Sequence, residues 1–281
     1  MLEISVAKTR RVIRVNGPAA IPEAVRRLAE HSYRELPFLS SAAWIEQEGV
    51  VMVVMPYPTP QIVHPVSLAV DDVEAAVEAM RAIGREHGKT VLGWWIAPEH
   101  DAFVSQLEAL GLVNEDTGGY EAVENVMALV TPPPLLAGDG VEVKQVESFD
   151  EFAGAARVAM EAFETPAHMR AELEAGLAER FEERQDPSNS ETDFIALIDG
   201  RIVAAASAIP AAAGVALFGG SVVPEVRGRG VYRALLRARW DFAVERGTPA
   251  LTVQAGRMAK PILERLGFVQ LAAVRLFFDR L

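Results

Sequence analysis

The 281-residue chain contains no cysteine. This excludes disulfide bonds, thiolate metal ligands and a cysteine nucleophile, and it removes one signature of a secreted protein. Long apolar runs are missing as well. No uncharged stretch reaches the roughly 18 residues that a membrane helix needs, and the N-terminal sequence lacks the apolar segment of a signal peptide. We therefore expect a cytoplasmic protein with no membrane partner.

Positive charge is scarce. Lysine and arginine number 27 against 39 acidic residues, which gives a formal net charge of −12. This balance argues against a general nucleic-acid binder or a protein of anionic membranes. Half of the residues are hydrophobic and 23% are charged, so the chain is able to build a sizeable core. Its length suits two domains of roughly 140 residues each.

A proline-rich stretch divides the chain. Three prolines follow Thr131, and the sequence Gly-Asp-Gly follows at 138–140. Consecutive prolines continue neither a helix nor a central strand, and they form a stiff extended spacer. We therefore predict a first domain over 1–132, a linker over 133–140 and a second domain over 141–281.

Apolar periodicity and turn signals predict alternating strands and helices in both parts, which is typical of an α/β fold. In the first part we expect strands at 11–15, 50–55, 61–70, 90–97 and 125–130, and helices at 22–31, from 71 and from 98. In the second part we expect strands at 141–146, 194–198, 201–209, 215–223, 250–254 and 272–279, and helices at 148–160, from 165, from 231 and just before Gly267.

One segment occurs twice. The sequence LEALGLV at 107–113 matches LERLGFV at 263–269, and both lie at the end of an expected short helix. Upstream of each, a longer helix ends in a glycine, Gly88 or Gly247. The two parts are therefore predicted to be copies of one α/β unit.

The stretch from Val222 to Trp240 has the pattern of an anion site. An apolar strand over 218–223 leads into the loop Arg227-Gly228-Arg229-Gly230, and a helical pattern begins at Val231. Backbone N–H groups at a helix N-terminus have no helical partner, and glycine lets a ligand approach them closely. Arginines 227, 229, 233, 237 and 239 add five positive charges with no acid after Glu225. We expect a polyanion to bind here.

The first part lacks this loop. At the corresponding place, residues 67–72 contain no glycine and end in Asp71 and Asp72. Carboxylates suit a helix N-terminus as caps, but they repel a phosphate. If one part binds the polyanion, it is the second.

Several phosphate-binding patterns do not fit. The P-loop sequence is absent, and Arg233 stands where a dinucleotide fingerprint needs its third glycine. RNA binding by the arginine face stays open, although only Tyr232 and Trp240 supply aromatic rings. A solvated basic helix after a turn is the remaining alternative.

The segment from Val222 to Leu236 resembles motif A of the GCN5-related N-acetyltransferases (GNAT), written R/Q-x-x-G-x-G/A. The resemblance continues through the strand at 250–254 to Leu266-Gly267-Phe268, and it covers essentially all of 141–281. The first part resembles the same fold weakly, as a degenerate copy. The resemblance implies an α/β (α+β) protein with two GNAT-like domains, each a mixed, mostly antiparallel sheet flanked by helices.

The resemblance also implies acetyl-CoA as acyl donor and a primary amine of a small molecule or peptide as acceptor. The amine attacks the thioester directly, a strand N–H holds the developing oxyanion, and no metal takes part. The expected donor-binding residues are Ser221, Val222, Val223, Arg227, Gly228, Arg229, Gly230, Val231, Tyr232 and Arg233.

Two departures from the family pattern concern catalysis and packing. Tyr232 replaces the small sixth residue of the motif, where its ring either stacks on the cofactor or fills the fold. Leu263 stands where the family often has a general-acid tyrosine, so the catalytic residues stay unassigned and a non-catalytic acyl-CoA-binding module is the alternative. Other candidate site residues also have an interpretation without a role in catalysis. His168, Glu161 and Glu164 suit an exposed surface, and Ser221 and Gln254 suit either substrate binding or backbone pairing.

The acceptor is suggested only by charge. Residues 161–192 carry nine acids and three arginines, in a region that commonly borders the acceptor in this family. The negative charge of this region favours a cationic amine as acceptor. The alternative interpretation is a solvated acidic helix face, which explains the same charges. The oligomeric state is not indicated.

Overall fold

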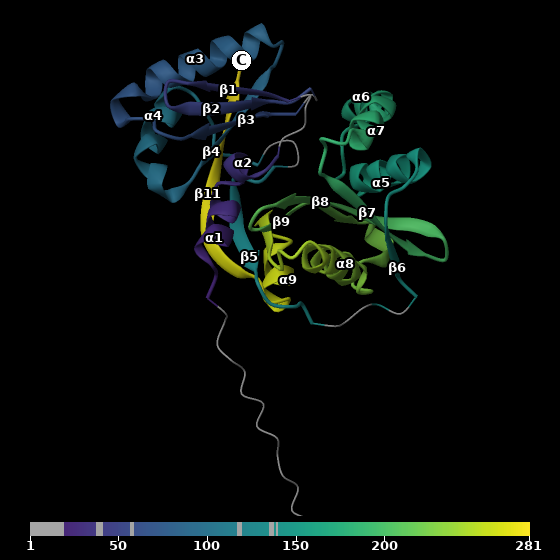
Figure 1. Cartoon of the computed structure of the whole chain (residues 1–281). Helices are drawn as coiled ribbons and strands as arrows, with labels where there is room; N and C mark the ends of the chain where they lie inside the picture. The colour runs from purple at the N-terminus through teal and green to yellow at the C-terminus, as the bar shows by residue number, and fades with distance from the viewer. Residues whose placement is uncertain (1–19, 38–41, 57–58, 117–119, 135–137, 139) are drawn as a thin grey trace, which may run out of the picture.

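The computed structural model describes residues 20–37, 42–56, 59–116, 120–134, 138 and 140–281. Within these ranges eleven strands form one continuous sheet, in the order β1-β2-β3-β4-β11-β5-β10-β9-β8-β7-β6. Most neighbouring strands are antiparallel, and helices flank the sheet (Figure 1). The strand that we expected at 11–15 lies outside the described residues. The expected mixed, mostly antiparallel sheet flanked by helices is confirmed.

The first half, up to the proline-rich stretch, contains the predicted elements that fall within the described residues in their predicted order, and also α2 and β1, which were not predicted. It contains α1 (Glu23–Glu30), α2 (Ser32–Glu35), β1 (Ala43–Gln47), β2 (Val50–Val54), β3 (Gln61–Pro65), a 3₁₀ turn η1 (Val70–Asp72), α3 (Val73–Glu86), β4 (Val91–Ile96), a 3₁₀ segment η2 (Pro98–Phe103), α4 (Val104–Ala109) and β5 (Val123–Leu129). Strand β3 is shorter than expected, because the chain turns after Pro65 and the N–H groups of Val66 and Ser67 donate to the Gly49 carbonyl.

The second half also keeps the predicted order. It contains β6 (Glu142–Gln145), α5 (Phe149–Ala162), α6 (Ala167–Ala175), α7 (Leu177–Gln185), β7 (Thr192–Ile198), β8 (Arg201–Ala211), β9 (Gly214–Val222), a 3₁₀ turn η3 (Pro224–Val226), α8 (Val231–Glu245), β10 (Leu251–Ala255), α9 (Lys260–Arg265) and β11 (Val269–Arg280). The one helix expected after Thr165 is broken at Gly176 into α6 and α7.

The core of the second half lies on both faces of β7–β9. Helix α8 covers one face and α5 the other (Figure 1). The stripe that the sequence predicts on α8 is largely buried, with Val231, Leu235 and Phe242 inside and Ala238 at its margin. Burying this apolar area is the main favourable contribution to folding here.

The repeated segment has the same local structure in both halves. Each short helix ends in a glycine with positive φ, +88° at Gly111 and +97° at Gly267. In each, the residue after the glycine donates its N–H to a buried leucine carbonyl at 3.0 Å, Leu112 to Leu107 and Phe268 to Leu263. This glycine-terminated helix end needs the left-handed conformation that only glycine adopts without strain. Each half also contains one parallel pair of strands, β3–β4 and β9–β10.

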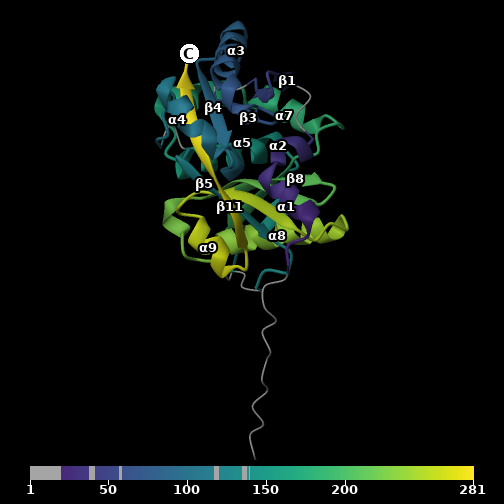
Figure 2. The same cartoon turned by 90° about the vertical axis from the view of Figure 1, so that its left-hand side faces the viewer.

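The two halves exchange strands. Strand β5 of the first half lies between β10 and β11 of the second half, with Val126 opposite both Gln254 and Ala272. Beyond Arg275, β11 leaves β5 and pairs with β4 of the first half, where Leu276 lies opposite Trp95. Figure 2 shows β11 running from the second half into the first. Each half therefore completes the sheet of the other.

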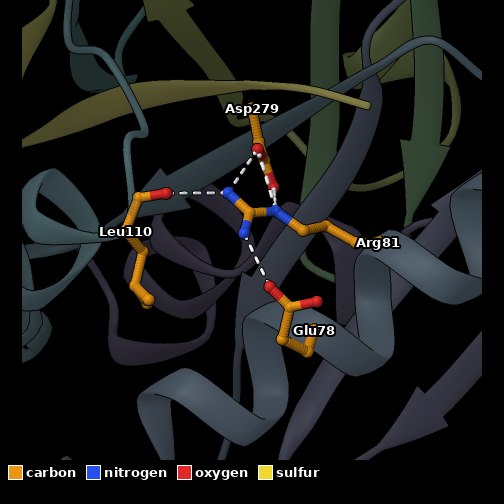
Figure 3. A network of polar contacts seen from close by, with 4 residues as sticks. All are labelled: Glu78, Arg81, Leu110 and Asp279. Atoms are coloured by element: carbon orange, nitrogen blue, oxygen red, sulfur yellow. Dashed lines mark hydrogen bonds and ion pairs between the residues drawn. The ribbon is translucent and has the colours of Figure 1, made fainter.

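A buried ion pair fastens the end of β11 to the first half (Figure 3). The Arg81 guanidinium, on α3, donates to both carboxylate oxygens of Asp279, and Nε lies 2.9 Å from Oδ2. The same guanidinium donates to the Leu110 carbonyl and to the Glu78 carboxylate. The hydrogen bonds to Asp279 are the main reason that the pKa of Arg81 is raised above its ordinary value.

Candidate active site at the end of strand β9

The glycine loop before α8 has the backbone geometry of an anion site. Gly228 and Gly230 have φ values of +82° and +86°. The Arg229 N–H donates to the Val226 carbonyl, but within the described chain no carbonyl accepts from the N–H groups of Gly228 and Gly230. The first-turn N–H groups of α8, from Val231 onward, have no helical partner either. These N–H donors lie together at the N-terminus of α8, where the helix dipole favours negative charge.

Strands β9 and β10 separate just before this loop. They pair at only two positions, Val215 with Leu251 and Ala216 with Thr252. Strand β9 continues to Val222 beside β8, whereas β10 stays paired with β5 as far as Ala255. The two parallel strands are therefore splayed beyond these positions.

A β-bulge lies within the splay. Ala205 lies opposite Ser221 and Ser207 lies opposite Phe218, so β9 has one more residue than β8 in this interval. Gly219 has a φ of +59°, and Gly219 and Gly220 are both exposed. A bulge leaves backbone groups without a ladder partner. A bulge is therefore present at these glycines, in the part of β9 that no longer pairs with β10.

The end of β9 is held by its neighbours. Ser221 is buried, and its hydroxyl donates to the Ala205 carbonyl at 3.2 Å. Of the two roles that the sequence leaves open for Ser221, the side chain takes backbone pairing. The Val223 N–H donates to the Val203 carbonyl.

Arg227 fastens the loop to the strand that precedes it. Its Nε donates to the Val222 carbonyl at 3.1 Å, and Nη2 donates to the Ala162 carbonyl at the end of α5. Arg229 is exposed, and Nη2 of Arg233 lies 3.1 Å from the point where a side chain on Gly230 would begin. Arg229 and Arg233 are therefore the arginines that remain for an anion at the loop.

The ring of Tyr232 packs inside the fold. Its Cε2 lies 3.0 Å from the position that a Cβ on Gly220 would occupy, so the ring packs against the backbone of the bulge. Burial raises the pKa of the Tyr232 hydroxyl, an effect that the nearby charge of Arg239 opposes. The ring thus fills the fold, and the residue offers a ligand its backbone N–H.

The five-arginine window is not one anion-facing surface, which corrects the expectation from the sequence. Arg239 is only 1% exposed, with its Nε donating to the Leu235 carbonyl and Nη1 to the Ser207 carbonyl. Burial lowers its pKa from the ordinary value. Arg237 pairs with Asp241 on the helix surface. The arginines lie on different sides of α8, because an α-helix makes one turn every 3.6 residues. A count along the sequence does not show which of them share a face.

The connection between the halves touches the loop. A Cβ on Gly138 would lie 2.1 Å from the Arg229 carbonyl oxygen, and the Gly138 backbone lies against Gly230. The sequence predicted a spacer in this region. It gave no sign that one of the linker glycines packs on the anion loop.

An acidic cluster lies on the sheet face that carries Phe218. Asp193, Ser207 and Phe218 are successive cross-strand partners, and the Ser207 hydroxyl donates to Asp193. Arg184 of α7 pairs with Asp193 and with Glu191, both at 2.7 Å. Burial raises the pKa of Glu191 to about 7, with Arg184 opposing the shift and Asp193 adding to it. Nothing in the sequence distinguishes Glu191 from the other eight acids of its region.

The first half contributes a side chain to the same face. The indole Nε1 of Trp95, on β4, lies 3.2 Å from Oε1 of Gln254 on β10. The imidazole of His64 lies next to Trp95, with ring centroids 5.8 Å apart. Burial, with smaller contributions from neighbouring His31, Arg34 and His100, lowers the pKa of His64 to about 3, so this imidazole is neutral at physiological pH.

The remaining candidates from the sequence have no such surroundings. Leu263, at the position of the family's tyrosine, is fully buried in the core. Glu161 and Glu164 are exposed at the end of α5. His168 lies in α6, and its side chain is outside the described part of the structure. Among the described residues, no helix is long and apolar enough to cross a bilayer, and no group of three or more His, Asp or Glu side chains is arranged to hold a metal ion.

Comparison with known families identifies this arrangement. The profile of the acetyltransferase (GNAT) family matches residues 157–268, a range that includes the splay, the bulge and the glycine loop. This part of the chain is therefore similar to the GNAT family of acetyltransferases. None of the curated protein sequences matches the chain.

Solved structures share the fold over nearly the whole chain. A GCN5-related N-acetyltransferase from Kribbella flavida superposes with a TM-score of 0.66 at 17% identity, covering 91% of this chain and 95% of its own. One from Sphaerobacter thermophilus gives 0.57 at 17% identity, covering 83% and 81%. A tandem GNAT protein from the clavulanic acid biosynthesis pathway gives 0.57 at 16% identity, covering 94% and 90%. At these identities the likeness shows the fold alone.

Proposed function

We propose that the protein is an acetyl-CoA-dependent N-acetyltransferase whose donor site lies in residues 141–281. The observation that carries the proposal is the group of unpaired N–H donors at Gly228 and over 230–233, at the mouth of the splay between β9 and β10. Residues 1–132 are a degenerate copy of the same unit, with Asp71 and Asp72 where the glycine loop would be. The first half serves as a structural partner that shapes the acceptor side.

The loop residues fit the pyrophosphate of acetyl-CoA. A side chain added at Gly228 would meet no atom within 4 Å, so the space in front of the loop is open to a ligand. The N–H groups of Gly228, Gly230 and Val231 would hold the phosphate oxygens, with Arg229 and Arg233 beside them. The edge of β9 at Ser221–Val223 would line the pantetheine arm. Once bound, the donor supplies an activated acetyl thioester.

Transfer needs an oxyanion donor and a place for the amine. Backbone N–H groups at the Gly219–Gly220 bulge suit the developing charge, because donors fixed in a sheet require no reorganisation. The amine is acetylated by direct attack, since the cysteine-free chain offers no thiol to carry an acyl group. The attacking amine loses a proton and the leaving CoA thiolate gains one, and both protons exchange with solvent because the buried Leu263 carries no titratable group.

The acidic face favours a cationic amine as acceptor. Arg170 and Arg180 both donate to backbone carbonyls, and Arg184 pairs with Glu191 and Asp193. Glu191 and Asp193 share that one arginine beside Phe218, which leaves the cluster with excess negative charge when both are ionised. A positively charged substrate would be attracted to it.

The second candidate is a non-catalytic acyl-CoA-binding module. The buried Leu263 favours it, because the side chain that often protonates the leaving thiolate in this family is replaced by one without a titratable group. Both candidates predict binding of acetyl-CoA, and only the first predicts its consumption.

Calorimetric titration with acetyl-CoA tests the donor site. The wild type should bind, and Gly230→Val should not, because a β-branched residue at a φ of +86° is strained and its Cβ would meet Gly138 and Arg233. Asp71→Asn, at the corresponding turn of the first half, should bind like the wild type. Absence of heat and of any thermal shift with the wild type would end both candidates.

Release of CoA from acetyl-CoA separates the two candidates. A thiol-reactive dye is suitable, because the cysteine-free protein contributes no signal. Amine-dependent release across a panel of amines supports the enzyme, and binding without release supports the module. Faster turnover of cationic than of neutral amines, with the difference lost at high salt, is expected for the acidic face. Equal rates at every salt concentration would exclude a cationic preference.

A further inference from the structure

Adjacent tryptophans on β4 have opposite surroundings. Trp94 points into the core of the first half, and its indole Nε1 is buried without a hydrogen-bond partner among the described residues. Trp95 points to the other face of the sheet and donates to Gln254 of the second half, 159 positions along the chain. The sequence predicts core packing for both. Of these two indoles, only that of Trp95 makes a polar contact between the halves.

This hydrogen bond fixes the orientation of the Gln254 amide. An indole N–H donates and cannot accept, so the amide atom that it contacts is the carbonyl Oε1. The Nε2 group of Gln254 therefore points away from Trp95, with both of its hydrogens available. No side chain or carbonyl in the described parts of the chain accepts from it, and Gln254 is partly exposed.

The position of Gln254 on β10 puts this donor beside the splay. Thr252 pairs with Ala216, so Gln254, two residues further along a parallel strand, lies at the level of Phe218. The bulge at Gly219–Gly220 begins immediately after Phe218. Because side chains alternate along a strand, Gln254 lies on the face opposite Val253, which packs against the core of the second half. The amide thus stands across the splay from the bulge.

We propose that Gln254 is a catalytic residue whose Nε2 donates a hydrogen bond to the acyl oxygen, and that Trp95 of the first half is the positioning residue that orients it. The inference rests on the proposed acetyl transfer. An acyl group held in the splay has the β9 backbone on one side and Gln254 on the other, so its oxygen receives donors from both strands. Two fixed donors stabilise developing negative charge better than one.

This arrangement gives the first half a role in the chemistry. The donor loop and Gln254 both belong to the second half, but the orientation of the amide depends on an indole from the first. The contact requires β4 and β10 to keep their relative positions, and the exchanged strands β5 and β11 lie between them. The exchange of strands therefore holds the catalytic amide in register.

The test uses four variants of the full chain. Gln254→Glu keeps the size and the acceptor for Trp95 but removes the Nε2 donor, and Gln254→Met removes the amide without adding charge. Trp95→Phe removes the indole N–H that orients the amide, together with part of the ring. Trp94→Phe is the matched control, since it makes the same change one residue away at an indole without a partner.

Two measurements are compared for each variant: the rate of CoA release from acetyl-CoA, with amines or with water as acceptor, and the calorimetric Kd values for acetyl-CoA and for CoA. CoA lacks the acyl oxygen, so its Kd should stay within about 2-fold in every variant, which also shows that the variants are folded. Both Gln254 variants should lower turnover about 100-fold, as the loss of one oxyanion donor does, and should reduce the preference for acetyl-CoA over CoA. Trp95→Phe should lower turnover about 5-fold, and Trp94→Phe should match the wild type.

The outcomes that contradict the inference differ from those that contradict the proposed function. If the wild type fails to bind acetyl-CoA, the proposed function is wrong. If the wild type binds and releases CoA, but Gln254→Glu keeps its rate and its preference for acetyl-CoA, the role of Gln254 is wrong. Equal losses in Trp95→Phe and Trp94→Phe would show that Trp95 acts through packing alone. If no CoA release is detected, the preference for acetyl-CoA decides: preserved in both Gln254 variants, it excludes the contact.

Discussion

Arg81 and Asp279 lie 198 positions apart in the chain and form a buried, three-bonded ion pair (Figure 3). Asp279 is 1% exposed and stands next to the last residue of β11, where this strand has crossed into the first half. The pair therefore joins the end of the exchanged strand β11 to helix α3 of the first half. Its loss should therefore weaken the joining of the two halves and not merely a local contact.

Asp279→Ala should lower the free energy of unfolding by about 3–5 kcal/mol, because it leaves the partly buried Arg81 guanidinium without its carboxylate. Asp241→Ala is the control. It breaks the exposed Arg237–Asp241 pair on α8 and should cost less than about 1 kcal/mol. Urea denaturation followed by circular dichroism measures both. Equal losses for the two variants would contradict a structural role for the pair.

Two arginines of the loop should respond differently to salt. Arg227 holds the Val222 and Ala162 carbonyls, whereas Arg229 is exposed and contributes charge. Arg227→Gln should raise the Kd for acetyl-CoA about 10-fold, a loss that persists at about 1 M salt because it changes the shape of the loop. Arg229→Gln should raise the Kd a few-fold at low salt and match the wild type at about 1 M salt. Calorimetric titrations across a salt series measure this, and parallel curves for the two variants would disprove the distinction.

Stability should depend on pH through Glu124 of the exchanged strand β5. Burial, with a smaller contribution from Glu121, raises the pKa of Glu124 to about 7. Tyr120 and Glu121 face it, and Arg257 pairs with Glu121. Since the folded pKa lies above the ordinary value of 4.5, the folded state holds this proton more tightly, and its contribution to stability is lost as pH rises from about 4.5 to about 7.

Glu124→Gln should remove that dependence. Relative to the wild type, the variant should gain up to about 3 kcal/mol of unfolding free energy between pH 5 and pH 8. Any contribution of Glu191 cancels, because it is present in both proteins. Glu108→Gln, at an exposed site, should show the same difference from the wild type at both pH values. A constant difference for Glu124→Gln would mean that its carboxyl is not buried in solution.

Local signals were sufficient for most elements of the fold. The Asp199-Gly200 turn joins β7 to β8 with φ values of +50° and +76°, as its residues predict. Ser148 accepts from the Glu151 N–H and caps α5, as the spacing of serine and glutamate at 148 and 151 predicts. The exchange of β5 and β11 was not predictable in this way. Strand pairing is set by contacts between residues more than 100 positions apart, such as Val126 and Gln254, and no local pattern encodes the partner.

The candidate site likewise has features that could be predicted from the sequence and features that could not. The loop and the bulge lie at glycines that the sequence displays directly. The direction of a side chain depends on what packs around it, so the inward ring of Tyr232 and the burial of Arg239 required the structure. The contact of Trp95 with Gln254 could not be found from sequence either, because it depends on the exchanged strands. The boundaries at 132 and 140, and the status of the first half as a degenerate copy, stay predictions.

The connection between the halves offers a last test of the donor loop. Gly138 and Gly140 lie two residues apart, but a Cβ at Gly138 would clash with the Arg229 carbonyl, whereas one at Gly140 would meet nothing within 4 Å. Gly138→Ala should therefore displace the loop and raise the Kd for acetyl-CoA at least about 10-fold. Gly140→Ala should cost about 1 kcal/mol of stability, because its φ is +72°, while binding acetyl-CoA like the wild type. Calorimetry and thermal unfolding of both variants measure the two effects. If Gly138→Ala binds acetyl-CoA normally, the connection does not hold the loop in the position seen here.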